Sequence, residues 1–281
     1  MQKFEKIYIE LTNFCGLHCT FCTPQKGEEI MPLELFAKIA KEIAPFSKLC
    51  TLHILGDPLK LKNLESYLKI AENLALEITT SGFYPAPLES LLNYKNIKQI
   101  NISLTSALYQ KQKINLEKYL KPILDFCTTH KARKSEKFIN LRVWNLNKAK
   151  VPPQENAELY TLLERYFNCK INPIKTRLSY KIHLIGASFF KWQDSSLSKN
   201  TQGFCLGGQK QLGILQSGIV TPCCFDTQGQ IALGDLKTQG FLEILQSRRL
   251  YNLTQGFKEN KRVESFCQTC PYPAYLENKN I

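Results

Sequence analysis

Short apolar runs alternate with amphipathic segments along the first two thirds of the chain. Runs with the composition and alternation of strands are predicted at residues 6–11, 50–55, 76–80, 99–105, 138–144 and 178–185. Between these runs, apolar residues recur every three or four positions, which predicts helices at residues 32–46, 59–74, 87–92, 117–130 and 156–167. Strands joined by helices of this length form parallel βαβ units with right-handed crossovers. The pattern therefore predicts an α/β fold with its chemistry at the C-terminal ends of the strands.

The last part of the chain follows a different pattern. Residues 212–220 predict a hairpin that turns at Ser217-Gly218, and residues 241–253 predict an amphipathic helix. We therefore expect two domains, a core over residues 1–190 and a small hairpin-plus-helix domain over residues 200–281.

The composition is that of a globular protein whose thiols are reduced. At 281 residues the chain is long enough to bury a full core, and it has no run of 18 apolar residues that would cross a membrane. Residues 1–6 lack the features of a secretory signal, so we expect a cytoplasmic protein. In that compartment the eleven cysteines are expected to be metal ligands or buried thiols rather than disulfides.

The formal net charge of +13 raises the question of a nucleic-acid partner. The lysines are scattered along the chain, and their densest stretch, residues 131–137, falls in a predicted loop between a helix and a strand. A solvated loop therefore explains this charge better than a nucleic-acid surface.

Three cysteines follow the first predicted strand with gaps of three and two residues: Cys15, Cys19 and Cys22. Three thiolates with this spacing can ligate three of the four irons of an iron–sulfur cube and leave the fourth iron open. A structural zinc needs four ligands in a closed tetrahedron, and no fourth ligand stands nearby. A disulfide framework needs an oxidising compartment. The motif therefore favours an open iron–sulfur site over a zinc site or free thiols.

This strand and its C-x3-C-x2-C motif, with aromatic Phe21 before the last cysteine, resemble the radical S-adenosylmethionine (SAM) superfamily. The resemblance implies an open partial (β/α)6 barrel, a [4Fe–4S] cluster on the three cysteines, and S-adenosylmethionine bound to the open iron. It also implies reductive cleavage of the cofactor to a 5′-deoxyadenosyl radical, which abstracts a hydrogen atom from the substrate. An external electron donor such as flavodoxin or ferredoxin is expected.

The turn after the second predicted strand matches a cofactor-binding position of this family. Leu55-Gly56-Asp57-Pro58 resembles the family's Gly-Gly-Glu-Pro turn, in which a glycine lets the backbone approach the cofactor's amino group. Leu55 replaces the first glycine and Asp57 replaces the glutamate, whereas Gly56 and Pro58 stand in register. The resemblance implies that Gly56, Asp57 and Pro58 contact the cofactor.

Other candidate cofactor contacts are Phe21, Ser103 and Arg142. Ser103, near the end of the fourth predicted strand, resembles a ribose-contacting serine. Arg142 is a charged residue inside an apolar strand, so it needs a carboxylate partner. That partner is either the carboxylate of the cofactor or an acid of the protein. The four histidines are isolated and are expected to be structural or exposed to solvent.

The last quarter of the chain holds a second group of cysteines, Cys205, Cys223, Cys224, Cys267 and Cys270. Together with the hairpin they resemble the C-terminal SPASM/Twitch extension of radical SAM enzymes, which holds auxiliary [4Fe–4S] clusters. The spacing is closest to the shorter Twitch form. It implies Cys205, Cys223, Cys267 and Cys270 as ligands and Cys224 as a spare thiol. A structural zinc with four thiolates is the alternative.

The resemblance thus implies an enzyme that oxidises or modifies a substrate with the auxiliary cluster as electron acceptor. A peptide and a small polar molecule are the two candidate substrates. Asp226 stands near a proton-accepting aspartate of related enzymes, although a turn residue is the alternative. An RNA-modifying enzyme and a non-catalytic, zinc-stapled binding protein are the competing functions. Neither a membrane partner nor a nucleic-acid partner is expected.

Overall fold

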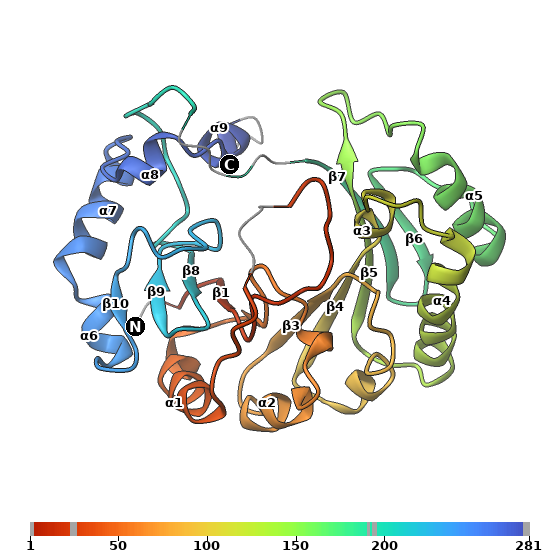
Figure 1. The fold of residues 1–281 in the computed structure, drawn as a ribbon, viewed down its shortest axis with the longest axis horizontal. Helices are drawn as coiled ribbons and strands as arrows, with labels where there is room; N and C mark the ends of the chain where they lie inside the picture. Colours follow the sequence, from red (N-terminus) through yellow and green to blue (C-terminus); the bar gives the residue numbers. More distant parts are fainter. Residues whose placement is uncertain (1–2, 23–26, 190–191, 193–195, 278–281) are drawn as a thin grey trace.

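A ten-stranded sheet organises the protein, as the computed structural model shows for residues 3–22, 27–189, 192 and 196–277. Its strand order is β10-β9-β8-β1-β2-β3-β4-β5-β7-β6 (Figure 1). The strands are β1 (Lys6–Ile9), β2 (Cys50–Thr51), β3 (Leu76–Thr80), β4 (Ile97–Ser103), β5 (Phe138–Leu146), β6 (Lys175–Ser179), β7 (Ile182–Ser188), β8 (Gln211–Ile214), β9 (Ile219–Thr221) and β10 (Gly234–Asp235).

The chain also forms helices, and most of them lie along the outer side of this curved sheet (Figure 1). They are α1 (Leu33–Ile43), α2 (Leu64–Ile70), α3 (Thr105–Leu108), α4 (Leu116–Ala132), α5 (Asn156–Phe167), α6 (Phe241–Leu245), α7 (Arg248–Lys258), α8 (Ser265–Gln268) and α9 (Tyr272–Glu277). Short 3-10 turns cover Ala44–Phe46, Pro58–Lys60 and Ser90–Asn93.

The central strands confirm the predicted parallel architecture. Strands β1, β2, β3, β4, β5 and β7 are neighbours in that order, and each adjacent pair is parallel. Parallel neighbours need a crossover between them, which the intervening helices and loops supply. The six strands therefore form a partial barrel, with the loop that carries Cys15, Cys19 and Cys22 directly after β1.

The sixth predicted strand, residues 178–185, is wrong in detail because the chain reverses direction within it. β6 and β7 are antiparallel, and Ser179 pairs with Ile182 across a two-residue turn. Lys181 adopts the left-handed conformation there, with φ of 52°. This turn carries neither glycine, proline nor asparagine, and apolar residues continue through it, so the sequence offers no signal for the reversal.

Three predicted helices are shorter than expected or divided. The segment at 59–74 is helical only in α2 and in the 3-10 turn Pro58–Lys60, and the segment at 87–92 forms only the 3-10 turn Ser90–Asn93. The segment at 241–253 divides into α6 and α7, because Ser247 adopts an extended conformation and caps α7. Its hydroxyl accepts the backbone N–H of Leu250 at 3.3 Å.

Parallel pairing of β1 with β8 joins the C-terminal segment to the barrel. Lys6 lies opposite Gln211, and Ile9 lies opposite Ile214. Helix α1 adds two contacts to the same segment: Lys38 Nζ donates to the carbonyl of Gln239 at 2.8 Å, and Glu42 accepts the N–H of Phe241 at 2.7 Å. The predicted hairpin, β8–β9, is thus part of the same sheet as the barrel strands.

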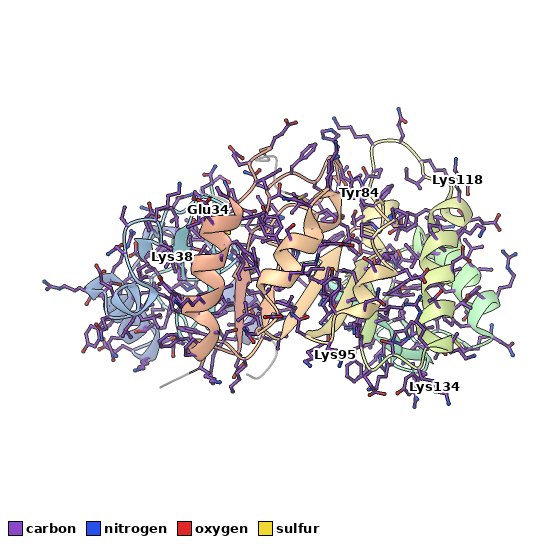
Figure 2. All side chains as sticks on the ribbon, turned by 90° about the horizontal axis from the view of Figure 1, so that it is seen from below. Glu34, Lys38, Tyr84, Lys95, Lys118 and Lys134 are labelled. Carbon is purple, nitrogen blue, oxygen red and sulfur yellow. The ribbon has the colours of Figure 1, made fainter. Side chains whose placement is uncertain are left out.

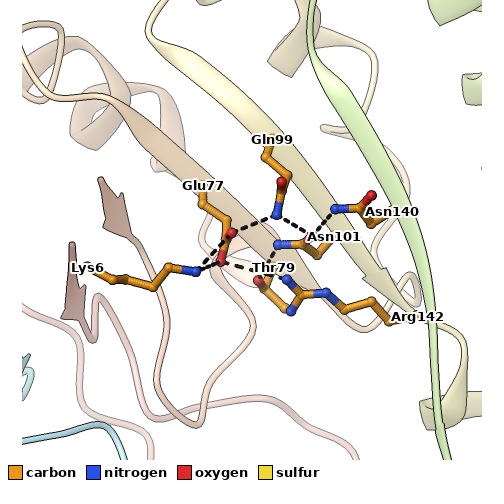
Figure 3. A network of polar contacts seen from close by, with 7 residues as sticks. All are labelled: Lys6, Glu77, Thr79, Gln99, Asn101, Asn140 and Arg142. Atoms are coloured by element: carbon orange, nitrogen blue, oxygen red, sulfur yellow. Dashed lines mark hydrogen bonds and ion pairs between the residues drawn. The ribbon is translucent and has the colours of Figure 1, made fainter. Parts of the chain in front are cut away.

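The two faces of the sheet differ in polarity. Ile7 and Ile9 of β1 are fully buried in the same apolar core as Phe36 and Ile39 of α1. Alternate residues on the strands point to the inner, concave face, where polar side chains follow one another across β3, β4 and β5 (Figure 3). Helices therefore cover the apolar face, and the polar face is directed into the barrel.

Lysines are dispersed over the outer surface. Lys38 lies on α1, Lys118 on α4, and Lys95 and Lys134 on separate loops (Figure 2). The densest basic stretch, residues 131–137, begins in α4 and continues into the loop before β5, and Lys137 within it is buried. Among the described residues, no helix has both the length and the apolar character needed to cross a membrane.

Candidate active site

The loop that carries the first three cysteines is held by backbone hydrogen bonds. The N–H of Thr20 donates to the carbonyl of Tyr109 at 3.0 Å, and the N–H of Cys22 donates to that of Cys19 at 3.1 Å. Cys15, Cys19 and Cys22 are half-buried and reduced. The structure therefore places three reduced sulfurs in one loop at the C-terminal end of β1.

Gln110 contacts the first cysteine loop, and the sequence analysis did not single it out. Its side-chain amide donates to Cys19 Sγ at 3.0 Å and to the carbonyl of Ser106 at 2.7 Å. Hydrogen bonds to cysteine sulfur stabilise the thiolate and tune an iron–sulfur cluster. Gln110 stands just after α3 in a polar segment, and only its position beyond the end of β4 hints at this role.

Lys60 and Tyr84 support the beginning of the loop. The Lys60 ammonium lies 4.1 Å from the centre of the Phe14 ring and donates to the Tyr84 hydroxyl at 3.3 Å. The Tyr84 hydroxyl in turn donates to the carbonyl of Cys15 at 2.5 Å. A cation and an aromatic ring thus fix the backbone at the first cysteine.

Gly56 is packed against the loop backbone. A Cβ atom at this position would lie 2.0 Å from the carbonyl oxygen of Thr12 and 3.0 Å from the backbone nitrogen of Phe14. The glycine is therefore required by the approach of two chain segments, apart from any contact with a cofactor.

Asp57 and Pro58 tie the same turn to β3. Asp57 is buried, and its carboxylate accepts the Leu59 N–H at 3.0 Å, the Thr80 hydroxyl at 2.9 Å, and the Ser81 N–H and hydroxyl at 2.8 and 2.6 Å. Pro58 begins the buried 3-10 turn. The structure gives Asp57 a full set of protein donors, so it positions the turn.

Glu10 is a second buried carboxyl that holds this region. Its Oε1 accepts the N–H of Leu55 at 3.1 Å, and a backbone hydrogen bond connects it with Gln216 of the β8–β9 hairpin. Burial raises the pKa of Glu10 to about 7, a rise that these backbone hydrogen bonds oppose. One side chain therefore contacts both the Leu55 turn and the C-terminal segment.

An aromatic group surrounds Phe21. Its ring lies 6.0 Å from that of Tyr109 and 5.4 Å from that of Phe189. Its carbonyl accepts the indole N–H of Trp192 at 3.2 Å, and Trp192 packs against Phe225 at 5.9 Å between ring centres. Phe225 is adjacent to Cys224, so these contacts run from the first cysteine loop to the second group.

Arg142 has a partner within the protein. Its guanidinium lies 3.9 Å from Glu77 Oε1 on β3 and 5.0 Å from the centre of the Trp144 ring (Figure 3). This is the protein acid that the sequence analysis left open as an alternative to the cofactor. Ser103 is the last residue of β4, is half-buried, and lies opposite Arg142 in the sheet register.

Four of the C-terminal cysteines lie close together. Cys205 lies within electrostatic range of Cys223, Cys267 and Cys270, and all four are buried. The backbone N–H of Gly207 donates to Cys205 Sγ at 3.5 Å. The structure therefore brings together the four thiols that the Twitch spacing implies.

Cys224 differs from these four in its hydrogen-bond partner. It is also within electrostatic range of Cys205 and Cys223. Its thiol is hydrogen-bonded to the hydroxyl of Tyr8 on β1, and the charge of Lys6 is close to it. Cys224 thus faces the inner side of the barrel.

Asp226 is fully buried and binds its own loop. Oδ1 accepts the N–H of Gln230 at 2.9 Å, and Oδ2 accepts that of Ile231 at 2.7 Å. A carboxylate that accepts backbone N–H groups of its own loop stabilises a turn. The structure thus supports the turn residue that the sequence analysis gave as the alternative to a substrate base.

Family models identify the two halves of this arrangement. Residues 9–141 match the radical SAM superfamily, and residues 205–271 match the SPASM iron–sulfur cluster-binding domain. The chain therefore belongs to the radical SAM superfamily and carries a C-terminal SPASM domain. The second match is to a domain that binds an iron–sulfur cluster, and it includes the C-terminal cysteine group.

Two curated relatives are similar over part of the chain. A GTP 3′,8-cyclase of Desulforamulus reducens is 31% identical over 115 residues, which is 37% of this chain and 35% of that protein. A GTP 3′,8-cyclase of Nautilia profundicola is 27% identical over 116 residues, which is 37% of this chain and 36% of that protein. The match thus spans about a third of the length of each relative.

Solved structures share the fold over nearly the whole chain. BtrN in complex with AdoMet and 2-DOIA has a TM-score of 0.59 at 16% identity, covering 96% of this chain and 94% of that one. SuiB of Streptococcus suis, bound to the precursor peptide SuiA, has a TM-score of 0.62 at 12% identity, covering 99% and 74%. These values establish the partial radical SAM barrel and its C-terminal extension as the fold.

The Gly56 contact predicts a specific defect. We expect Gly56→Ala to displace the Thr12–Phe14 backbone, to destabilise the protein by about 1–3 kcal/mol, and to reduce iron in the first loop. Iron content and the thermal midpoint measure both effects. Gly240→Ala is the matched control, because a Cβ there meets nothing within 4 Å. Equal behaviour of the two variants would contradict the steric role.

The pKa of Glu10 predicts a pH dependence. Because the folded protein favours the protonated form, ionisation between the ordinary pKa of 4.5 and about 7 costs stability as the pH rises. We expect wild type to lose up to about 3 kcal/mol relative to Glu10→Gln between pH 5 and pH 8. Thermal midpoints of wild type and Glu10→Gln, recorded at one scan rate across this pH range, measure the difference in stability. A difference between the two proteins that does not change with pH would refute the prediction.

Substitution of Asp226 separates its two candidate roles. If the carboxylate staples the turn, Asp226→Asn loses one N–H acceptor, and we expect destabilisation by about 1–3 kcal/mol with cofactor cleavage retained. Urea or thermal unfolding and 5′-deoxyadenosine formation measure the two quantities. Loss of turnover with full iron content and unchanged stability would instead establish Asp226 as a base.

Proposed function

We propose that this enzyme abstracts a hydrogen atom from a small polar substrate and transfers the remaining electron to an auxiliary [4Fe–4S] cluster. When bound, the first cluster and S-adenosylmethionine supply the carbon radical for this step, and the second cluster supplies the electron acceptor. The observation that supports this proposal most is that four C-terminal thiols lie close together. The segment that carries them pairs, through β8, with β1, the strand that leads into the first cysteine loop.

The donor sets fit these clusters. Cys15, Cys19 and Cys22 would hold the cofactor-binding cluster, and the Gln110 amide supports the thiolate of Cys19. Cys205, Cys223, Cys267 and Cys270 would hold the auxiliary cluster, and the Gly207 N–H supports Cys205.

A structural zinc on the same four thiolates is the alternative to an auxiliary cluster. The match of residues 205–271 to an iron–sulfur cluster-binding domain favours the cluster.

Aromatic residues link the two cysteine groups. Phe21, Trp192 and Phe225 form consecutive contacts, and the Tyr272 ring lies tilted against Phe225 with 4.9 Å between ring centres. Such packing supports electron transfer from a substrate held between the groups. Reduction of the first cluster would come from an external one-electron donor such as flavodoxin or ferredoxin.

A small polar substrate suits the inner face of the barrel. That face presents the charged side chains of Lys6, Glu77 and Arg142, and these match hydroxyl, amine or acidic groups of a ligand (Figure 3). A peptide with polar side chains is the second candidate substrate.

Metal analysis after anaerobic reconstitution tests this function. We expect about eight irons and no zinc per chain, with Cys223→Ser falling to about four irons and Cys224→Ser remaining at about eight. Protein-dependent formation of 5′-deoxyadenosine should accompany the wild-type iron content. About four irons with one zinc would remove the auxiliary cluster as electron acceptor, and absence of iron would overturn the proposal.

A further inference from the structure

The inner face of the barrel has a polar floor, which we define as Lys6, Thr51, His53, Glu77, Arg142 and Gln211. Lys6 Nζ contacts the two carboxylate oxygens of Glu77 at 3.0 and 3.1 Å (Figure 3). The Gln99 amide donates to the same carboxylate at 2.7 Å. Glu77 is therefore held from two sides, and its orientation is fixed.

A chain of amides behind Glu77 is hydrogen-bonded within the protein. Asn101 Oδ1 accepts from Gln99 at 2.9 Å and from Asn140 at 3.0 Å, and Asn101 Nδ2 donates to Thr79 at 3.2 Å (Figure 3). These side chains build the floor but have few groups left for a ligand.

The floor carries more positive than negative charge. Two cations, Lys6 and Arg142, share the single carboxylate of Glu77, and Arg142 lies at the longer distance of 3.9 Å. Burial and the neighbouring Arg142 lower the pKa of His53 to about 4, so its ring is neutral at pH 7. Glu10, further along β1, directs its carboxyl to backbone groups of Leu55 and Gln216. The floor thus has a net charge of about +1 at neutral pH.

Three buried polar atoms of the floor have no hydrogen-bond partner among the residues that the structure describes. They are Thr51 Oγ1, His53 Nδ1 and Gln211 Nε2. Thr51 is 0% exposed and Gln211 is 9% exposed. An unpartnered buried polar group costs about 1–3 kcal/mol, so groups of this kind are rare unless a ligand or water completes them.

The sheet register gathers these atoms around the charges. Gln211 lies opposite Lys6 on β8, and Thr51 lies between Tyr8 and Glu77 on β2. His53 is within electrostatic range of Lys6, Glu77 and Arg142. The three unpartnered atoms and the excess positive charge therefore lie together on the inner face of the barrel.

We propose that this floor anchors an anionic oxygen group of the substrate, either a carboxylate or a phosphate ester. The proposal rests on the function proposed above and names the chemical class of its substrate. Lys6 and Arg142 supply charged donors, and Gln211, Thr51 and His53 supply neutral hydrogen bonds. Lys6 is at the start of β1, whereas the cysteine loop follows its end, so an anchored substrate extends toward the cofactor.

Anion binding to the reconstituted enzyme tests the site. Sodium pyrophosphate and sodium succinate are titrated separately, with saturating S-adenosylmethionine and ionic strength held constant with KCl, and the thermal midpoint is followed. We expect a saturable rise with at least one anion. A rise with pyrophosphate alone identifies a phosphate ester, and a rise with succinate alone identifies a carboxylate. No saturable rise with either anion overturns the site.

Variants place the binding on the floor. We expect Lys6→Met to lower the affinity for the anion at least tenfold. Lys62 is an exposed lysine before α2, and we expect Lys62→Met to bind the anion as wild type does. Gln211→Leu removes one unpartnered donor without changing charge. It should raise the midpoint without anion and reduce the shift with anion, even if Lys6→Met fails to fold. A wild-type shift in Gln211→Leu would contradict the proposal.

The two proposals fail in different ways. Iron content and 5′-deoxyadenosine formation are measured on the same wild-type preparation. If both are normal and no anion binds, the anchoring site is wrong and the proposed function stands. If iron and cofactor cleavage are absent, the proposed function is wrong.

Discussion

Parallel pairing between β1 and β8 is the constraint on which the rest of the structure depends. Because β1 is central in the ten-stranded sheet, its C-terminal end carries the first cysteine loop while its side carries the hairpin that leads to Cys223. The sheet hydrogen bonds fix the spacing of neighbouring strands at about 4.8 Å, so the relative position of the two cysteine groups is set by backbone geometry. Tyr8 and Glu10 reinforce this by contacting Cys224 and Gln216 of the C-terminal segment.

Buried carboxyls and one glycine give the first loop its shape. Glu10 and Asp57 both accept backbone N–H groups at the turn after β2, and Gly56 allows that turn to approach Thr12. The sequence analysis singled out Gly56 and Asp57, because their turn resembles a cofactor-binding turn, but not Glu10. In the structure Gly56 and Asp57 contact the protein itself, so two residues of the motif also hold the loop.

The sequence predicted the parallel order of the strands and both cysteine groups, because these depend on local patterns and short spacings. It missed the reversal at Lys181, since the turn lacks the usual turn residues. It also missed Gln110, whose contact with Cys19 spans 91 positions. The choice between Glu77 and the cofactor as partner of Arg142 was open for the same reason. Register between distant strands brings these groups together, and no local pattern encodes it.

The ends of the sheet have a consequence for how copies of the chain meet. An open sheet exposes backbone donors and acceptors at its outermost strands, and another molecule can add to them. Here the outer strands are β10, which has two residues, and β6, which carries exposed Lys175 and Arg177. A two-residue strand offers little length for pairing, and positive charges repel a second copy of the same edge. The sheet is thereby protected from growth into aggregates at both margins.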